Sequence, residues 1–249
     1  MEVILYGIIF IYGIIFGSFL NVCIYRIPEK KDIVTRSHCM KCGYPIKWYD
    51  LIPIISYVCL RGKCRKCGEK ISLQYPLVEA LNGCLWVVLF YCYGFQWKTL
   101  LYCLLISILI VISVIDVRTY EIPPVLNGSI GILGIVQIIL DNGNWKNYVI
   151  GFFCVSVFLL VLYFISRGRA IGGGDVKLMA VTGLVIGWKL VLFAFFSGCI
   201  FGAVIHSMRM RFDGEGKVLA MGPYLAAGTV CALVFGNPCI HWYLSMCLL

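Results

Sequence analysis

Residues 99–116 read TLLYCLLISILIVISVID, and this stretch decides the fold class. The run 99–115 contains no Asp, Glu, Lys or Arg, and Asp116 ends it. About 20 such residues in a helix cross the hydrocarbon core of a bilayer, which is roughly 30 Å thick. The whole chain is 61% hydrophobic and 13% charged, whereas soluble proteins are roughly 45–50% apolar and about 25% charged. The sequence therefore predicts an integral membrane protein and excludes an ordinary soluble domain.

Further charge-free intervals occur along the chain at 3–25, 80–97, 122–140, 147–166, 178–188, 190–208 and 218–249. We therefore expect an all-α polytopic membrane protein with about eight transmembrane helices. The interval 178–188 is the shortest, and it crosses the membrane only if Asp175 and Lys177 lie near its end.

The chain divides into three expected parts. Residues 1–25 form a first transmembrane helix, 26–75 form a polar loop domain, and 76–249 form a multi-helix transmembrane domain. The first interval lacks a basic start and a small-residue cleavage site, so we expect a retained helix and not a signal peptide. Gly13 and Gly17 form a G-x-x-x-G pattern, which favours close approach of another helix.

Positive charge predicts the orientation of the chain. Threading eight spans places nearly all of the 21 Lys and Arg on the side of the 26–75 loop, the exceptions being Lys98, Lys146 and Lys189. Because cytoplasmic loops carry the excess of Lys and Arg, we expect this loop in the cytoplasm and the N-terminus outside the cell membrane. Omitting the interval 178–188 as a span weakens this bias.

The net charge of +9 indicates contact with anionic lipid. The basic loop has no alternation of aromatic and basic residues of the kind that binds nucleic acid, so we expect no nucleic-acid partner.

The loop carries two C-x-x-C pairs, Cys39/Cys42 and Cys64/Cys67. Their spacing is typical of a four-thiolate zinc site, although the gap between the pairs is slightly long. Gly43 and Gly68 follow the pairs directly and allow the positive φ of a tight turn. Four protein ligands leave no open position for water, so we predict a structural zinc. The alternatives are two disulfides, which a cytoplasmic location disfavours, or four free thiols.

Two acidic residues adjoin predicted spans, where a charge is costly and often functional. Asp116 ends the third expected span, and Asp175 precedes the sixth after Gly172, Gly173 and Gly174. In the eight-span threading both lie at the cytoplasmic boundary. Two carboxylates that meet can share one proton, act as general base and general acid, and activate water, as in aspartic proteases. The alternative is that they are ordinary interfacial charges, paired with Arg118 and Lys177.

Several segments together resemble the type IV prepilin peptidases, which are membrane aspartic peptidases of the Gly-x-Gly-Asp kind. The matching segments run across nearly the whole chain and lie at 17–28, 39–67, 75–79, 115–116, 172–179 and 221–226. One departure follows the first aspartate, where many members have Pro-Asp and this chain has Pro123 and Pro124.

This resemblance implies an endopeptidase that removes the short basic leader of prepilins or pseudopilins next to a glycine at the cytoplasmic membrane face. It implies that Asp116 and Asp175 are the catalytic pair. It also implies methylation of the new N-terminal amine in many members, with S-adenosylmethionine as donor. We expect the substrate to contact the residues Glu79, Gly172, Gly173, Gly174 and Lys177.

Two other functions use the same residues. A proton-coupled membrane transporter would relay protons through both aspartates, although transporter sites usually lie near the midplane between repeats and no repeat is visible here. A membrane assembly factor would bind partners through the cysteine loop and would not need the aspartates for chemistry.

Overall fold

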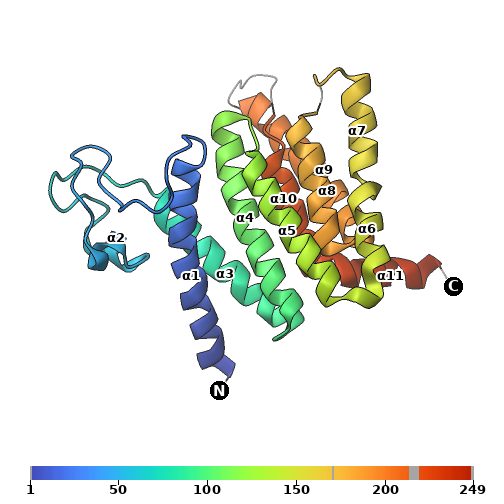
Figure 1. The fold of residues 1–249 in the computed structure, drawn as a ribbon, viewed down its shortest axis with the longest axis horizontal. Helices are drawn as coiled ribbons and strands as arrows, with labels where there is room; N and C mark the ends of the chain where they lie inside the picture. The colour runs from blue at the N-terminus through green and yellow to red at the C-terminus, as the bar shows by residue number, and fades with distance from the viewer. Residues whose placement is uncertain (1, 170, 213–218, 248–249) are drawn as a thin grey trace. The chain divides into compact units, whose positions relative to one another are not determined.

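The computed structural model describes residues 2–169, 171–212 and 219–247. The described residues form helices and loops, with two isolated β-bridges and no strand (Figure 1). The chain divides into two compact units, residues 1–94 and 95–249, which we describe separately.

The first unit is built on two helices, α1 (Glu2–Arg26) and α3 (Gln74–Tyr93). Gly13 and Gly17 are the contact points, because a Cβ on Gly13 would lie 2.7 Å from Cα of Gly83, and one on Gly17 would lie 2.8 Å from Cα of Glu79. The Asn82 side chain donates a hydrogen bond to the Gly13 carbonyl oxygen at 2.7 Å. The close helix approach predicted from the G-x-x-x-G pattern is therefore confirmed.

The loop between these helices contains little regular structure. It has a 3-10 turn, η1 (Trp48–Leu51), and a short helix, α2 (Ile55–Cys59). Each cysteine pair is closed by an antiparallel bridge, His38 with Pro45 in the first and Lys63 with Lys70 in the second.

The second unit contains the remaining helices. They are α4 (Trp97–Thr119), α5 (Pro124–Leu140), η2 (Asn142–Asn144), α6 (Trp145–Cys154), α7 (Ser156–Ile165), α8 (Gly173–Ile186), α9 (Trp188–Phe212), α10 (Gly222–Cys231), the π-helical η3 (Ala232–Gly236) and α11 (Asn237–Cys247). Helix α4 is the most buried of the long apolar helices and packs against α5 and α10. Helix α8 packs against α5 and α6.

Glycines bring α6 and α8 into backbone contact. A Cβ on Gly151 would lie 2.4 Å from the Gly183 carbonyl oxygen, and one on Gly183 would lie 2.1 Å from the Gly151 carbonyl oxygen. Neither position has room for a side chain, so the two glycines hold α8 in one register against α6.

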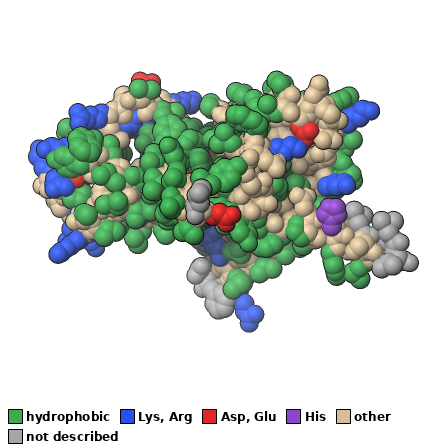
Figure 2. Space-filling model, turned by 90° about the horizontal axis from the view of Figure 1, so that it is seen from below, with side chains coloured by type: hydrophobic (Ala, Val, Ile, Leu, Met, Phe, Trp, Pro, Cys, Tyr) green, Lys and Arg blue, Asp and Glu red, His purple; other side chains and the backbone are tan. Residues whose placement is uncertain are grey.

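Six helical segments are long and apolar enough to cross a membrane, namely Glu2–Arg26, Gln74–Tyr93, Trp97–Thr119, Asn142–Ile165, Trp188–Arg211 and Gly222–Tyr243. Hydrophobic side chains accordingly cover much of the face shown in Figure 2. The all-α multi-pass architecture is confirmed. The count of eight spans is not, because α5 has 17 residues and α8 has 14. The last predicted interval extends past the described residues at Val218, Leu248 and Leu249.

Candidate functional site

Asp116 lies in the last turn of α4 and is buried. The helix ends at Tyr120, which adopts the left-handed conformation with φ of 54°. The Oδ2 atom of Asp116 accepts a hydrogen bond of 2.8 Å from the backbone N–H of Gly222, at the start of α10. This hydrogen bond stabilises negative charge on Asp116 and connects α4 with α10.

Asp175 lies in the first turn of α8 and is also buried. Gly172 precedes the helix, and a Cβ there would lie 3.0 Å from Oδ2 of Asp175. A Cβ on Gly174 would lie 3.1 Å from Cβ of Ile122. Two of the three glycines thus make room, one for the carboxylate and one for the segment before α5. The helix N-terminus favours a negative charge at this position.

Both aspartates lie in the second unit, on the helices α4 and α8, which are in contact with each other. Asp116 and Asp175 are close enough for their charges to interact. Within the described parts of the chain neither forms an ion pair, and Oδ1 of Asp175 has no hydrogen-bond partner. The pairs with Arg118 and Lys177 that the alternative interpretation requires are therefore not observed. Lys177 is exposed on α8.

Gly222 is a site residue to which sequence reasoning assigned no role. A Cβ at this position would lie 2.8 Å from Oδ2 of Asp116, so the close approach of the N–H requires glycine. Two sequence signals mark this position: the Gly222-Pro223 dipeptide, which is typical of a turn leading into a helix, and its place in the segment 221–226 that resembles the prepilin peptidases.

Glu79 belongs to the first unit and lies in the second turn of α3. Its side chain is buried, and Oε2 accepts a hydrogen bond of 2.8 Å from the backbone N–H of Ile54. It lines a cavity of about 700 Å³ between α1, α3 and the cysteine loop. Contact of Glu79, Gly172, Gly173, Gly174 and Lys177 with substrate stays a prediction.

The four cysteines of the loop form one cluster. The Sγ atoms of Cys39, Cys42, Cys64 and Cys67 all lie within 4.8 Å of one another, and those of Cys39 and Cys67 are 3.8 Å apart. A tetrahedral site with Zn–S bonds of about 2.3 Å has sulfur atoms about 3.8 Å apart. Every cysteine whose side chain the structure describes is free, so the disulfide alternative is not observed. This cluster could hold a metal ion.

Both cysteine pairs have the same backbone geometry. The N–H of Cys39 donates to the Tyr44 carbonyl oxygen at 2.9 Å, and the N–H of Cys64 donates to the Glu69 carbonyl oxygen at 2.8 Å. Gly43 and Gly68 have φ of 66° and 72°, as predicted. The backbone N–H groups of Cys42 and Lys41 lower the pKa of the Cys39 thiol to about 6. The pKa of Cys67 is raised to about 11, because desolvation and hydrogen bonds with the other three cysteines outweigh the hydrogen bond from the backbone N–H of Glu69.

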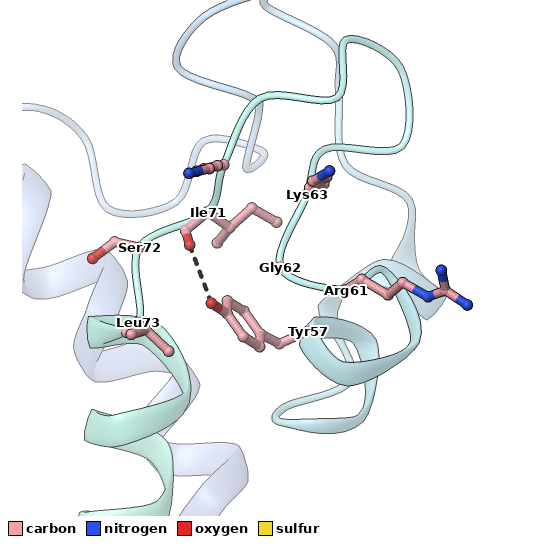
Figure 3. Close-up of a pocket in the computed structure, with 8 residues that line it drawn as sticks. Tyr57, Arg61, Gly62, Lys63, Ile71, Ser72 and Leu73 are labelled. Carbon is pink, nitrogen blue, oxygen red and sulfur yellow. Dashed lines mark hydrogen bonds between the residues drawn. The ribbon is translucent and has the colours of Figure 1, made fainter.

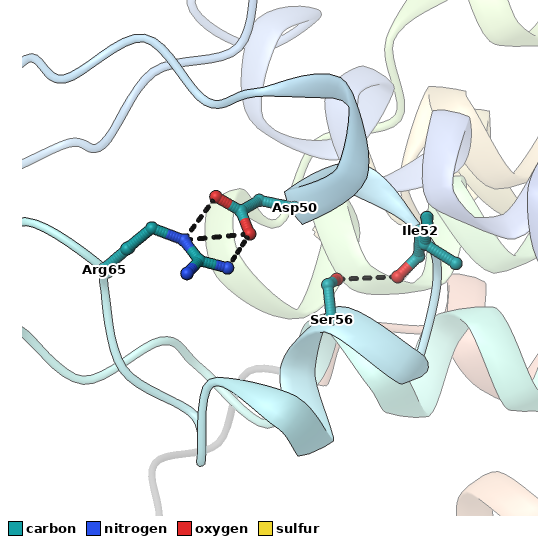
Figure 4. Close-up of polar contacts among 4 residues, drawn as sticks. All are labelled: Asp50, Ile52, Ser56 and Arg65. Carbon is teal, nitrogen blue, oxygen red and sulfur yellow. Dashed lines mark hydrogen bonds and ion pairs between the residues drawn. The ribbon is translucent and has the colours of Figure 1, made fainter.

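Polar contacts hold the loop around this cluster. The Tyr57 hydroxyl donates a hydrogen bond of 3.3 Å to the Ile71 carbonyl oxygen (Figure 3). Arg65 makes a bidentate ion pair with Asp50, with distances of 2.6 Å from Nη2 to Oδ1 and 3.0 Å from Nε to Oδ2 (Figure 4). The Arg65 guanidinium lowers the pKa of the Asp50 carboxyl. These contacts connect η1 and α2 to the second cysteine pair and to the segment before α3.

Two family models match the chain. Residues 11–93 match the bacterial peptidase A24 N-terminal domain, and residues 103–207 match the type IV leader peptidase family. The first match lies within the first unit. The second contains both Asp116 and Asp175.

Two curated relatives match this chain over nearly its full length. A protein of Bacillus subtilis (strain 168), named prepilin leader peptidase/N-methyltransferase, is 33% identical over 97% of this chain and 99% of its own length. A protein of the same name from Aeromonas salmonicida (strain A449) is 31% identical over 96% of this chain and 94% of its own length. No solved structure matches. On the strength of these matches, the chain belongs to the type IV leader peptidase family.

Proposed function

We propose that this protein is an endopeptidase of the cell membrane that removes the leader of type IV prepilins or pseudopilins after glycine. The observation that supports this most strongly is the pair of buried carboxylates, Asp116 and Asp175, inside the region that matches the leader peptidase family. Proton-coupled transport is not favoured, because the relatives are named as peptidases.

The two carboxylates share one proton in the proposed mechanism. We assign Asp116 as the base, because the N–H of Gly222 donates a hydrogen bond to its carboxylate, whereas Oδ1 of the buried Asp175 has no hydrogen-bond partner among the described residues. Asp116 takes a proton from water as the water oxygen attacks the carbonyl carbon of the glycine, and Asp175 protonates the carbonyl oxygen. The tetrahedral intermediate then collapses as Asp116 gives its proton to the amide nitrogen and Asp175 takes a proton back from a hydroxyl of the intermediate. The C–N bond breaks, the mature pilin leaves with a free amine, and both carboxyl groups return to their starting state.

We further propose N-methylation of this new amine, because the curated relatives carry that activity in their names. S-adenosylmethionine would supply the methyl group. In the loop domain, Cys39, Cys42, Cys64 and Cys67 would hold a structural zinc, since their sulfur atoms already form a tetrahedral-sized cluster. Such a zinc would stabilise a loop that has little apolar core of its own.

The proposed orientation follows from the charge distribution. The loop and both aspartates face the cytoplasm, beside the anionic lipid of the inner leaflet, and the N-terminus lies outside. A prepilin holds its leader in the cytoplasm and its apolar helix in the bilayer. Its scissile bond would therefore lie at the depth of Asp116 and Asp175.

The test uses purified full-length protein in detergent with a prepilin substrate. Asp116→Asn and Asp175→Asn keep the shape of the side chain and remove its charge, so we expect each to lower kcat by at least about 1,000-fold. Mass spectrometry of the product, with and without S-adenosylmethionine, reports cleavage and methylation together.

Glu121→Gln is the matched control, because Glu121 is an exposed acid close to Asp116 in the sequence. It should cleave at the wild-type rate. Wild-type cleavage by either Asp variant would contradict the dyad assignment.

A further inference from the structure

Apolar side chains are exposed on the cysteine loop, outside the long apolar helices. The α2 patch consists of Trp48, Leu51, Ile55 and Val58, and Trp48 and Val58 are 76% and 67% exposed. Ile55 and Val58 are three residues apart and lie on one face of α2. We propose that the α2 patch is a membrane-surface anchor that inserts among the headgroups of an anionic bilayer.

The position of the α2 patch relative to the expected membrane boundary supports this proposal. Ile54, which directly precedes α2, donates its backbone N–H to Oε2 of Glu79 at 2.8 Å. Glu79 lies in the second turn of α3, a helix long and apolar enough to cross the membrane. Ile54 makes this contact with a φ of 60°, which is rare for a β-branched residue. The start of α2 is thus held beside the first turns of α3, near the membrane boundary.

Cations gather next to the α2 patch. Arg61, Lys63 and Lys70 line a cavity of about 480 Å³ that Tyr57 and Ser72 also border (Figure 3). In the described part of the chain none of these three cations forms an ion pair, in contrast with Arg65 and Lys41, which pair with acids. No acidic residue lines the cavity.

The second β-bridge places two of these cations opposite each other. Lys63 and Lys70 are antiparallel partners, and like charges directly opposite destabilise such a pair. A lipid phosphate in the cavity would neutralise this repulsion. An exposed apolar face beside unpaired Lys and Arg is the composition by which interfacial segments bind anionic membranes.

The charge of Arg61, Lys63 and Lys70 favours the membrane over a substrate as the partner of the α2 patch. The leader implied by the family resemblance is basic, so Arg61, Lys63 and Lys70 would repel it. The anionic headgroups of the bilayer, into which α1 and α3 insert on either side of the loop, attract the same residues.

The test measures Trp48 fluorescence in nanodiscs of phosphatidylcholine, with and without phosphatidylglycerol. Subtracting the emission of Trp48→Phe from that of the wild type isolates the contribution of Trp48. Brominated acyl chains should quench this contribution at least about twofold in discs that contain phosphatidylglycerol. Val58→Asp, and Lys63→Gln combined with Lys70→Gln, should each reduce the quenching.

Lys30→Gln combined with Lys31→Gln removes the same charge from the other end of the loop and should leave the quenching unchanged. If brominated lipid does not quench Trp48 while aqueous acrylamide does, the proposal is wrong. Quenching of Trp48 that appears only after prepilin is added would assign the α2 patch to substrate and would also overturn it. If Val58→Asp fails to fold, the comparison of wild type with Trp48→Phe still decides.

Discussion

Gly222 places one backbone N–H against Asp116, and this contact has no room for a side chain. Gly222→Ala would put a Cβ 2.8 Å from Oδ2 of Asp116 and displace the carboxylate or α10. Because a displacement of about 1 Å at a catalytic group costs about 100-fold, we expect kcat for prepilin cleavage to fall by at least about tenfold. Initial rates over a range of prepilin concentrations measure kcat.

Gly128→Ala is the control, since its Cβ would meet nothing within 4 Å. Equal kcat values for both variants would show that the Gly222 contact is not needed.

Single residues also show where sequence reasoning succeeds and where it stops. Gly43 and Gly68 could be predicted because the turn after each C-x-x-C pair is local. The roles of Gly222 and Ile54 could not, since each acts through a backbone N–H that reaches a carboxylate distant in the sequence. A backbone donor leaves no side-chain pattern to read.

At the scale of elements, the two cysteine turns should depend on a common metal. Without it, the four sulfur atoms within 4.8 Å of one another would have no common ligand, and the loop would lose its cross-link. We expect Cys42→Ser combined with Cys67→Ser to lower the zinc content from about one per chain to near zero. The loop should then be cut by trypsin at Lys and Arg residues that are protected in the wild type.

Elemental analysis and limited proteolysis measure these two effects. Cys59→Ser is the control, because Cys59 is an exposed cysteine of the same loop outside the cluster. Full zinc content in the double variant would contradict the four-thiolate site.

An ion pair ties α4 to the segment between α5 and α6. Lys98 lies 2.5 Å from Oδ2 of Asp141, which also accepts a hydrogen bond of 2.6 Å from the Tyr148 hydroxyl. These contacts lower the pKa of Asp141 from 3.8 to about 2.

A lowered carboxyl pKa adds stability above pH 3.8 that is lost as the pH falls towards 2. We expect Asp141→Asn to lower the free energy of unfolding by about 1 kcal/mol at pH 7, because solvent partly screens this ion pair. Thermal unfolding in detergent should show this difference shrinking between pH 4 and pH 2. A difference that is independent of pH would exclude the ion pair as its cause.

At the scale of the whole molecule, the charge distribution predicts the sidedness of each loop. With eight spans, the segment around Arg167 and Arg169 is cytoplasmic, whereas Lys189 and the C-terminus lie outside. Alkaline phosphatase fused after Arg169 should be inactive, and the enzyme fused after Lys189 or at the C-terminus should be active. Inactive fusions at both Lys189 and the C-terminus would mean that α8 does not cross.

Much of the overall architecture could be read from charge-free intervals, because membrane helices must be long and apolar. The breaks in the helices within these intervals could not be predicted. The interval 147–166 is divided at Val155 into α6 and α7, and nothing in its composition marks the break. Likewise, Asp116 and Asp175 were each recognisable from their surroundings, but their proximity depends on how α4, α5 and α8 pack. Long-range packing of this kind is not encoded in any local pattern.

The short length of α8 has a consequence for the lipid around the candidate site. Its 14 residues rise about 21 Å, roughly 9 Å less than the hydrocarbon core. If α8 crosses the membrane, local thinning of the bilayer is one way to accommodate this hydrophobic mismatch. A thinned bilayer beside Asp175 would let water and headgroups descend to the carboxylates. A peptide bond at the edge of a pilin helix would then be hydrolysed without leaving the membrane.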